Sequence, residues 1–274
     1  MKPCILFSKN VMLCFANGRK SHRDELSRNG GTSLRNPKAN SVRKMASVAA
    51  VIVCYFAAAF VAAGAKNPAA QAMFFADKGK FAIQVDGQTV AHEDFEIAPA
   101  GAGWVAKGTT ELKVPQTTPT AVTGTLTLQR DGAPISYEWT SQGEKTNGAH
   151  ILFANGVAKV TLEMQGARPF EQDMAFNTPL IVILDNNLYH QYAILACLYD
   201  WQRRGAQTFP VLIPQELTPG SISVESTGET SVAGKNYQAL RATTSDLEVL
   251  LYLDKDHRLE RLEVPSARVL IVRE

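Results

Sequence analysis

From Phe81 onward, apolar and polar residues alternate with a period of two, and pairs of residues that favour tight turns separate the runs. Successive side chains of a β-strand point to opposite faces, so this alternation predicts strands with one buried face. Asn and Gly accept the positive φ that tight hairpins require. The turn pairs are Asp-Gly at 86–87 and 131–132, and Asn-Gly at 147–148 and 155–156. The N-terminal half is therefore predicted to be an antiparallel meander.

The alternation also assigns faces within individual strands. Ile135, Tyr137 and Trp139 fall on one face of a predicted strand, and alternate residues from 158 to 164 fall on one face of another. Similar runs predict C-terminal strands at 209–213, 221–226, 237–243, 247–253, 259–264 and 267–272. Because no repeat of fixed period and no linker separates these runs, residues 73–274 are predicted to form a single β-rich domain.

One segment, from Asp185 to Gly205, breaks the pattern. It is too long for a strand, begins with Asp and Asn that suit helix capping, and ends in two arginines and a glycine. At 100° per residue an apolar stripe contains Leu188, Leu195 and Tyr199, while His190 lies on a narrow polar arc. The predicted fold class is mainly β, with a strongly curved antiparallel sheet or open barrel and one long helix packed against its concave face.

Residues 46–65 form a run of twenty residues without charge, which follows Arg43 and Lys44 and ends among small residues. A basic start, an apolar centre and small-x-small sites at 63–65 and 70–72 are typical of a secretory signal peptide. A run of this length can also span a bilayer, so anchoring in the inner membrane by residues 46–65 is the alternative. We expect residues 45–72 to be a signal peptide or membrane anchor, and the mature protein to be periplasmic or secreted.

Residues 1–44 hold ten Lys or Arg against two acids, in a composition typical of a disordered segment. The alternative is that they are untranslated and lie upstream of the true start codon. Without residues 1–65 the chain holds 18 basic and 24 acidic residues, a balance of −6. A nucleic-acid-binding function is therefore not expected. Contact with a membrane is expected only through the N-terminal segment.

Candidate chemistry is sparse in the mature chain. Of the residues 92–94, His-Glu-Asp, only His92 and Asp94 share a strand face, and two ligands do not define a zinc site. We interpret this stretch as a solvated face, and we expect no metal and no cofactor. Cys197 is the one cysteine after residue 65 and is interpreted as a small buried hydrophobe. The serines lack a Gly-x-Ser-x-Gly elbow, so no enzymatic activity is predicted.

Large aromatic residues are the candidates for a ligand pocket. Aromatic side chains on the strands could line a cavity together with residues of the predicted helix, or could be ordinary core. The predicted ligand-binding residues are Trp104, Tyr137, Trp139, Phe153, Tyr192 and Leu195.

The order of several segments resembles bacterial periplasmic proteins of an uncharacterised domain family. The similar segments are 85–95, 188–201, 209–211, 232–237 and 251–262. The resemblance implies a curved antiparallel sheet or open barrel around a helix, akin to periplasmic lipoprotein carriers. It implies no catalytic residue.

The predicted export and the predicted curved sheet with its helix are compatible with two classes of function. The first is a periplasmic protein that binds or carries an apolar or amphiphilic ligand, such as a lipid, in its curved sheet. The alternative is a non-enzymatic envelope structural or assembly protein that docks a partner protein.

Overall fold

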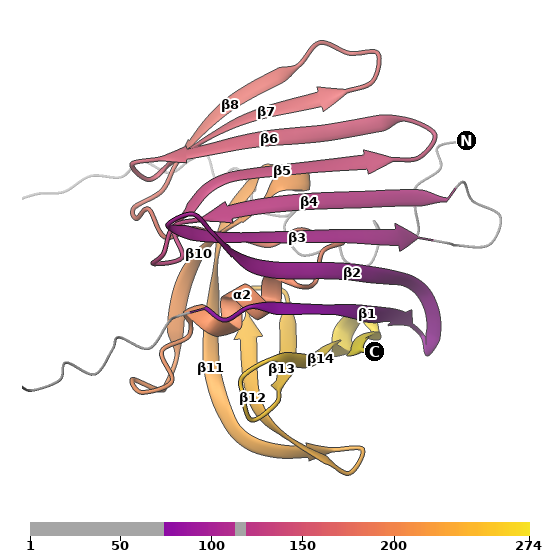
Figure 1. Cartoon of the computed structure of the whole chain (residues 1–274), viewed down its shortest axis with the longest axis vertical. Coiled ribbons are helices and arrows are strands. Elements are labelled where there is room, and N and C mark those ends of the chain that lie inside the picture. The colour runs from indigo at the N-terminus through magenta and orange to yellow at the C-terminus, as the bar shows by residue number, and fades with distance from the viewer. Residues whose placement is uncertain (1–73, 113–118) are drawn as a thin grey trace, which may run out of the picture. The chain divides into compact units, whose positions relative to one another are not determined.

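The computed structural model describes residues 74–112 and 119–274 (Figure 1). The predicted basic segment 1–44 and the predicted signal or anchor 45–72 lie outside the described residues. Within the described part of the chain, no helix has both the length and the apolar character that a membrane span requires.

Fifteen strands in the described residues form one sheet, in the order β8-β7-β6-β5-β4-β3-β2-β1-β15-β14-β13-β12-β11-β10-β9. Their bounds are β1 Asp77–Val85, β2 Gln88–Ala100, β3 Gly103–Leu112, β4 Thr120–Leu128, β5 Pro134–Gln142, β6 Thr146–Ala154, β7 Val157–Met164, β8 Phe170–Ala175, β9 Val182–Ile183, β10 Gln207–Ile213, β11 Thr218–Val232, β12 Lys235–Thr243, β13 Glu248–Leu253, β14 Leu259–Val264 and β15 Val269–Arg273. Neighbours in the sheet are antiparallel, except for the parallel pair β9 and β10.

β1 and β15, the first and last strands along the chain, lie side by side in the middle of the sheet. β1 pairs with β15 from Phe81 opposite Arg273 to Val85 opposite Val269, which joins the N-terminal and C-terminal meanders. β8 and β9 are the two ends of the order and do not pair with each other, so the sheet is open. Figure 1 shows β1–β8 running across the view and β11 and β12 nearly upright, as expected of a strongly twisted sheet. The prediction of a mainly β fold is confirmed, and a closed barrel is not formed.

Three of the four predicted turn pairs lie in turns. Asp86 and Gly87 have φ values of 53° and 76°, and Asn155 and its following glycine have similar positive values. The prediction for Asn147 and Gly148 is wrong, because both residues pair with β5 inside β6. The neighbouring turn instead lies at residues 143–145, between the end of β5 and the start of β6.

The predicted face of β5 is interrupted near its start. Tyr137 is fully buried and Trp139 is partly buried, but Ile135 is 42% exposed. The register shifts between Thr127 and Leu128 of β4, and Ile135 is the extra residue of this bulge. A bulge breaks the strict alternation on which the sequence prediction rested.

The prediction of a long helix from 185 to 205 is wrong. The one α-helix in the described residues is α2, Gln191–Leu198, and Tyr199 already has an extended backbone with ψ of 123°. Asp185 accepts a hydrogen bond from the backbone N–H of Asn187 at 3.0 Å, and Asp200 accepts one from Gln202 at 2.9 Å. These side chains build local turns on either side of α2, because Asp can bond nearby backbone groups in non-helical conformations.

The segment that contains α2 nevertheless packs onto the sheet. Leu188 and Leu195 are fully buried, as the predicted apolar stripe required. Residues 188–190 approach the sheet closely because two glycines face each other across neighbouring strands, Gly108 of β3 and Gly124 of β4. A Cβ on Gly108 would overlap the His190 ring, and a Cβ on Gly124 would overlap the Leu188 side chain. The missing side chains therefore make the groove in which residues 188–190 lie.

Candidate functional site

The segment 185–191 is held on the sheet by buried polar contacts, and Glu93 of β2 is at their centre. A Glu93 oxygen lies 2.5 Å from Nδ1 of His190, and both side chains are at most 1% exposed. The same carboxylate accepts hydrogen bonds from the backbone N–H groups of Tyr189, at 2.8 Å, and His190, at 3.3 Å. Glu93 thus satisfies three donors from a segment that lies almost one hundred residues later in the chain.

Two sequence predictions are corrected here. Glu93 was assigned to a solvated face, and His190 to an outward polar arc, yet both are buried. The signal for Glu93 was present in the alternation, because Ala91, Phe95 and Ile97 are inward-facing residues of the same strand. His190 could not be found in this way, because the segment around it is not a continuous helix.

A second buried pair lies beside the first. The Tyr137 hydroxyl donates to an Asp185 oxygen at 2.6 Å, and the Asp185 backbone N–H donates to Oε1 of Gln191 at 2.5 Å. Burial raises the pKa of the Asp185 carboxyl, and burial together with the nearby Asp185 charge raises the pKa of Tyr137 well above its ordinary value. The side chains of Tyr137, Asp185 and Gln191 are at most 3% exposed. Their hydrogen bonds therefore hold the 185–191 segment on the sheet and are closed to solvent.

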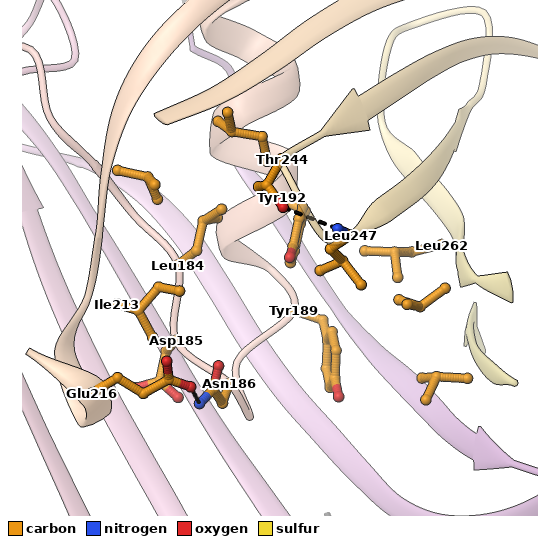
Figure 2. Close-up of a pocket in the computed structure, with 14 residues that line it drawn as sticks. Leu184, Asp185, Asn186, Tyr189, Tyr192, Ile213, Glu216, Thr244, Leu247 and Leu262 are labelled. Atoms are coloured by element: carbon orange, nitrogen blue, oxygen red, sulfur yellow. Dashed lines mark hydrogen bonds between the residues drawn. The ribbon is translucent and has the colours of Figure 1, made fainter. Parts of the chain in front are cut away.

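A cavity lies between this segment and the C-terminal half of the sheet (Figure 2). Figure 2 shows Asp185, Asn186 and Glu216 together at one end and the ring of Tyr189 farther along. Its volume is about 60 Å³, well below the several hundred Å³ of an ordinary small-molecule site. The lining residues are mostly apolar: Leu184, Asp185, Asn186, Tyr189, Tyr192, Val211, Ile213, Glu216, Ile222, Thr244, Leu247, Leu262, Val264 and Val269.

The structure separates the six residues predicted to bind a ligand. Tyr192 lines the cavity, whereas Tyr137 and Leu195 are fully buried in the core. Trp104, Trp139 and Phe153 are partly buried and pack against the core from three different strands. Trp104 contacts Phe74, with 5.8 Å between the ring centroids. Their ligand-binding role stays a prediction.

A row of apolar residues crosses the sheet toward its β8 end. Trp139 is opposite Ala149, which is opposite Leu162, which is opposite Phe170. Phe170 is 46% exposed, and the neighbouring Met164 is 48% exposed. Both lie on the face that is buried elsewhere in the sheet, since Ala158 and Met174 share this face and are buried. Among residues 74–112 and 119–274, nothing therefore covers the inner face at this end.

Residues suited to metal binding or thiol chemistry do not form a site in the described part of the chain. No group of three or more His, Cys, Asp or Glu among these residues could hold a metal ion. Burial raises the pKa of the Cys197 thiol to about 12, which keeps it protonated and unreactive near neutral pH.

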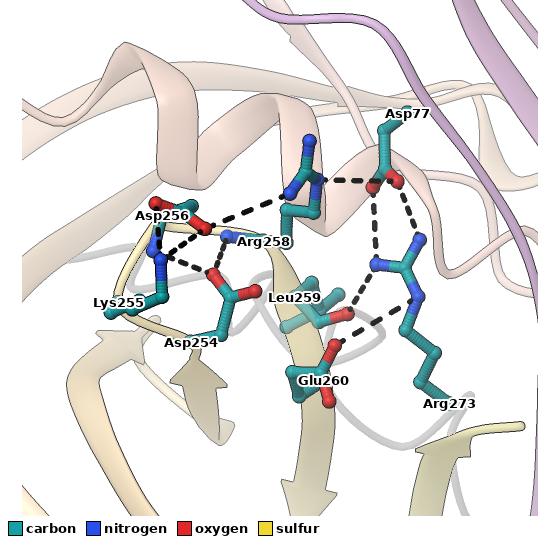
Figure 3. Close-up of polar contacts among 8 residues, drawn as sticks. All are labelled: Asp77, Asp254, Lys255, Asp256, Arg258, Leu259, Glu260 and Arg273. Atoms are coloured by element: carbon teal, nitrogen blue, oxygen red, sulfur yellow. Dashed lines mark hydrogen bonds and ion pairs between the residues drawn. The ribbon is translucent and has the colours of Figure 1, made fainter.

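A charged network lies where β1 meets the C-terminal strands (Figure 3). Arg273 donates to both oxygens of Asp77, at 2.5 and 3.2 Å, and to the Leu259 carbonyl at 3.2 Å. Glu260 lies 4.0 Å from the same guanidinium, and Arg258 approaches Asp77 at 3.9 Å. Burial raises the pKa of Asp77 despite these two guanidinium groups. The network joins the two ends of the described chain and is structural.

The chain matches no protein-family model and no curated protein sequence. Among solved structures it is similar to a β-barrel-like protein of the domain of unknown function DUF1849 from Brucella abortus, with 8% identity and a TM-score of 0.49 over 73% of this chain and 94% of that one. It is also similar to a DUF1089 family protein from Pseudomonas aeruginosa, with 12% identity and a TM-score of 0.39 over 66% of this chain and 91% of that one.

Proposed function

We propose that this is an exported, non-enzymatic envelope protein that docks a partner protein at the uncovered β8 end of its sheet. The observation that carries the proposal is the difference between the two parts of the inner face. Residues 184–199 cover one part, whereas Phe170 and Met164 remain almost half exposed on the other. Exposed large apolar side chains that gather in one place are typical of interaction sites.

The competing function, carriage of a lipid or another amphiphile, has less support from the geometry. Leu188, Leu195 and Ala196 pack in the core together with residues of the sheet, and each is fully buried. The cavity beside this segment, about 60 Å³, is too small for an amphiphile. A second hollow of about 380 Å³ lies open at the surface by the ends of β6 and β7, and polar groups such as Thr140, Asn147 and Glu163 contribute to its lining. The chain itself therefore occupies the volume that a carrier would leave for its ligand.

Catalysis also lacks support. The His–Glu pairs at the surface, His92 with Glu274 and His150 with Glu138, are open to solvent and lie outside the cavity. The buried pairs with acid or base character, Glu93 with His190 and Tyr137 with Asp185, are at most 3% exposed. A substrate could not reach them without displacement of the whole 185–191 segment. Export is proposed from the uncharged run at 46–65 and its basic flank.

The docking proposal is tested by photo-crosslinking in cells that naturally produce the protein. A photoreactive amino acid in place of Phe170 is expected to form an adduct with a discrete protein species. The matched control replaces Leu152, which is 50% exposed but lies on the outer face of β6, and is expected to form no such adduct. Lipid adducts alone at position 170, or the same protein adducts at both positions, would contradict the proposal.

A further inference from the structure

The two ends of the sheet differ in how they are protected. β9 has two residues, both at most 3% exposed, so this end is short and covered. β8 has six residues, five of them exposed, and it pairs with β7 along its whole length. In the described residues, β8 is the last strand on its side of the sheet. The far side of such a strand presents unpaired backbone N–H and C=O groups, which can pair with another extended chain.

The two faces of β8 have different chemistry. Phe170, Gln172 and Met174 point to the inner face, since Met174 is buried opposite the inward-facing Ala158. Glu171 and Asp173 point to the outer face, and both are exposed. An added strand would therefore meet Phe170, Gln172 and Met174 on the inner face and a pair of acids on the outer face.

The charges around these acids leave the outer face of this end negative. Lys159 of β7 is opposite Asp173, and Thr161 is opposite Glu171. Glu163 follows on the same face of β7 and is exposed. Three acids thus share this corner with one lysine, while Arg168 lies in the turn before β8.

We propose that β8 accepts an extended segment of a partner protein, which adds to the sheet as a further strand and carries Lys or Arg at alternate positions. The basic side chains lie opposite Glu171 and Asp173. The apolar residues that alternate with them point to the inner face, where the one opposite Phe170 continues the apolar row. Backbone hydrogen bonds supply affinity in this mode of recognition, and alternate side chains supply specificity. This inference rests on the proposed docking function and states the chemistry of the partner.

A second copy of the chain is a poor occupant of the same edge. If two β8 strands paired in antiparallel fashion with their faces matched, a register centred on Gln172 would place Glu171 opposite Asp173 twice. A register centred on Glu171 would place Glu171 opposite Glu171 of the second copy, and a register centred on Asp173 would place Asp173 opposite Asp173. Like charges directly opposite each other destabilise a strand pair, and an odd shift would turn the apolar row outward. The two acids therefore protect the edge from self-pairing and favour a basic strand.

The test uses two short synthetic peptides that alternate valine with lysine or valine with glutamate. The purified mature protein is expected to bind the lysine peptide at least about tenfold more tightly than the glutamate peptide, since two opposite charge pairs replace two like pairs. Binding is expected to slow amide hydrogen exchange in residues 170–175 and to weaken at high salt. Equal binding of the two peptides, or unchanged exchange in β8, would overturn the proposal.

Variants of β8 test whether the preference for the lysine peptide arises at this strand. The double variant Glu171→Lys/Asp173→Lys is expected to reverse the preference in favour of the glutamate peptide. The matched control Glu96→Lys/Glu248→Lys has the same change of net charge at exposed positions in β2 and β13, away from β8, and is expected to keep the original preference. A reversal in the control would mean that net charge alone governs binding. Equal unfolding midpoints of both variants and the wild type establish that each is folded.

The outcome also separates this inference from the docking function on which it rests. If the lysine peptide fails to bind while the crosslink from position 170 persists, strand addition by a basic segment is wrong and the docking function stands. If both fail, the docking function itself is wrong. A wild-type dimer in sedimentation analysis that Gln172→Pro abolishes would show instead that the edge pairs with a second copy.

Discussion

Replacement of Leu195 by Asp is expected to prevent accumulation of the folded protein. Leu195 lies in α2 and is fully buried among apolar residues. A carboxylate at this position would lose its hydration without gaining a partner, at a cost of about 4 kcal/mol or more. Since a domain of this kind is stable by about 5–15 kcal/mol, this is a large share of the total. Urea unfolding monitored by circular dichroism measures the loss.

The matched control is Leu152→Asp. Leu152 is 50% exposed on the outer face of β6, so its carboxylate would remain hydrated. Its free energy of unfolding is expected to stay within about 1 kcal/mol of the wild type. Equal stability of the two variants would mean that α2 does not pack against the sheet as described.

The second large effect is expected from Glu93→Ala. The change removes the acceptor of the His190 ring and of two backbone N–H groups, all in the core. Removal of one partner from a buried pair costs about 3–5 kcal/mol, because the other partner keeps its burial and loses its contact. We expect the midpoint of urea unfolding to fall accordingly.

Asp94 is the matched control for Glu93, since it is the next residue of the same strand and points to the opposite face. Its carboxylate is 68% exposed and lies 3.5 Å from Lys80, and exposed pairs of this kind contribute at most about 1 kcal/mol. Asp94→Ala is therefore expected to be nearly neutral. A small effect of Glu93→Ala would show that the 185–191 segment is held mainly by its apolar contacts.

Much of the fold was predictable because strand patterns are local. The alternation in residues 157–164 and the turns at 86–87 and 155–156 each depend on neighbours in sequence, and the structure confirms them. The six predicted C-terminal strands correspond to β10–β15, with ends that differ by a few residues. Strand ends vary more because they depend on pairing with a neighbour, as in β11, where a bulge near Ser226 lets the strand continue to Val232.

The segment around α2 was harder to predict, because tertiary contacts decide its conformation. Its composition suits a helix, yet Asp185 bonds Tyr137 and His190 bonds Glu93, and both partners are far away in sequence. The pairing of Gly108 with Gly124, which makes room for the segment, is likewise a property of the sheet. The helix propensity of a segment does not depend on such contacts between residues far apart in sequence, so it could not predict them.

The proposed docking edge was not predictable for a similar reason. The sequence predicted a strand face at 158–164, but strand order decides which strand is left at the end of the sheet. Nothing local in the sequence marks Glu171 and Asp173 as residues of an edge strand, because the order of strands in the sheet decides that β8 is terminal. The exposure of Phe170 follows from the same order. Aromatic residues such as Trp104 and Phe153 looked like pocket residues, because composition does not reveal what fills a curved sheet.

The central proposal is that residues 184–199 occupy the part of the inner face where a ligand would otherwise bind, so that the protein acts through its open edge at β8 and carries no amphiphile. The most direct measurement is extraction of the protein, purified from cells that naturally produce it, with organic solvent, followed by mass spectrometry of the extract. We expect no lipid or other amphiphile in stoichiometric amount, because the cavity beside the 184–192 segment has a volume of about 60 Å³. One equivalent of a defined amphiphile per protein molecule would contradict the claim and restore the carrier function.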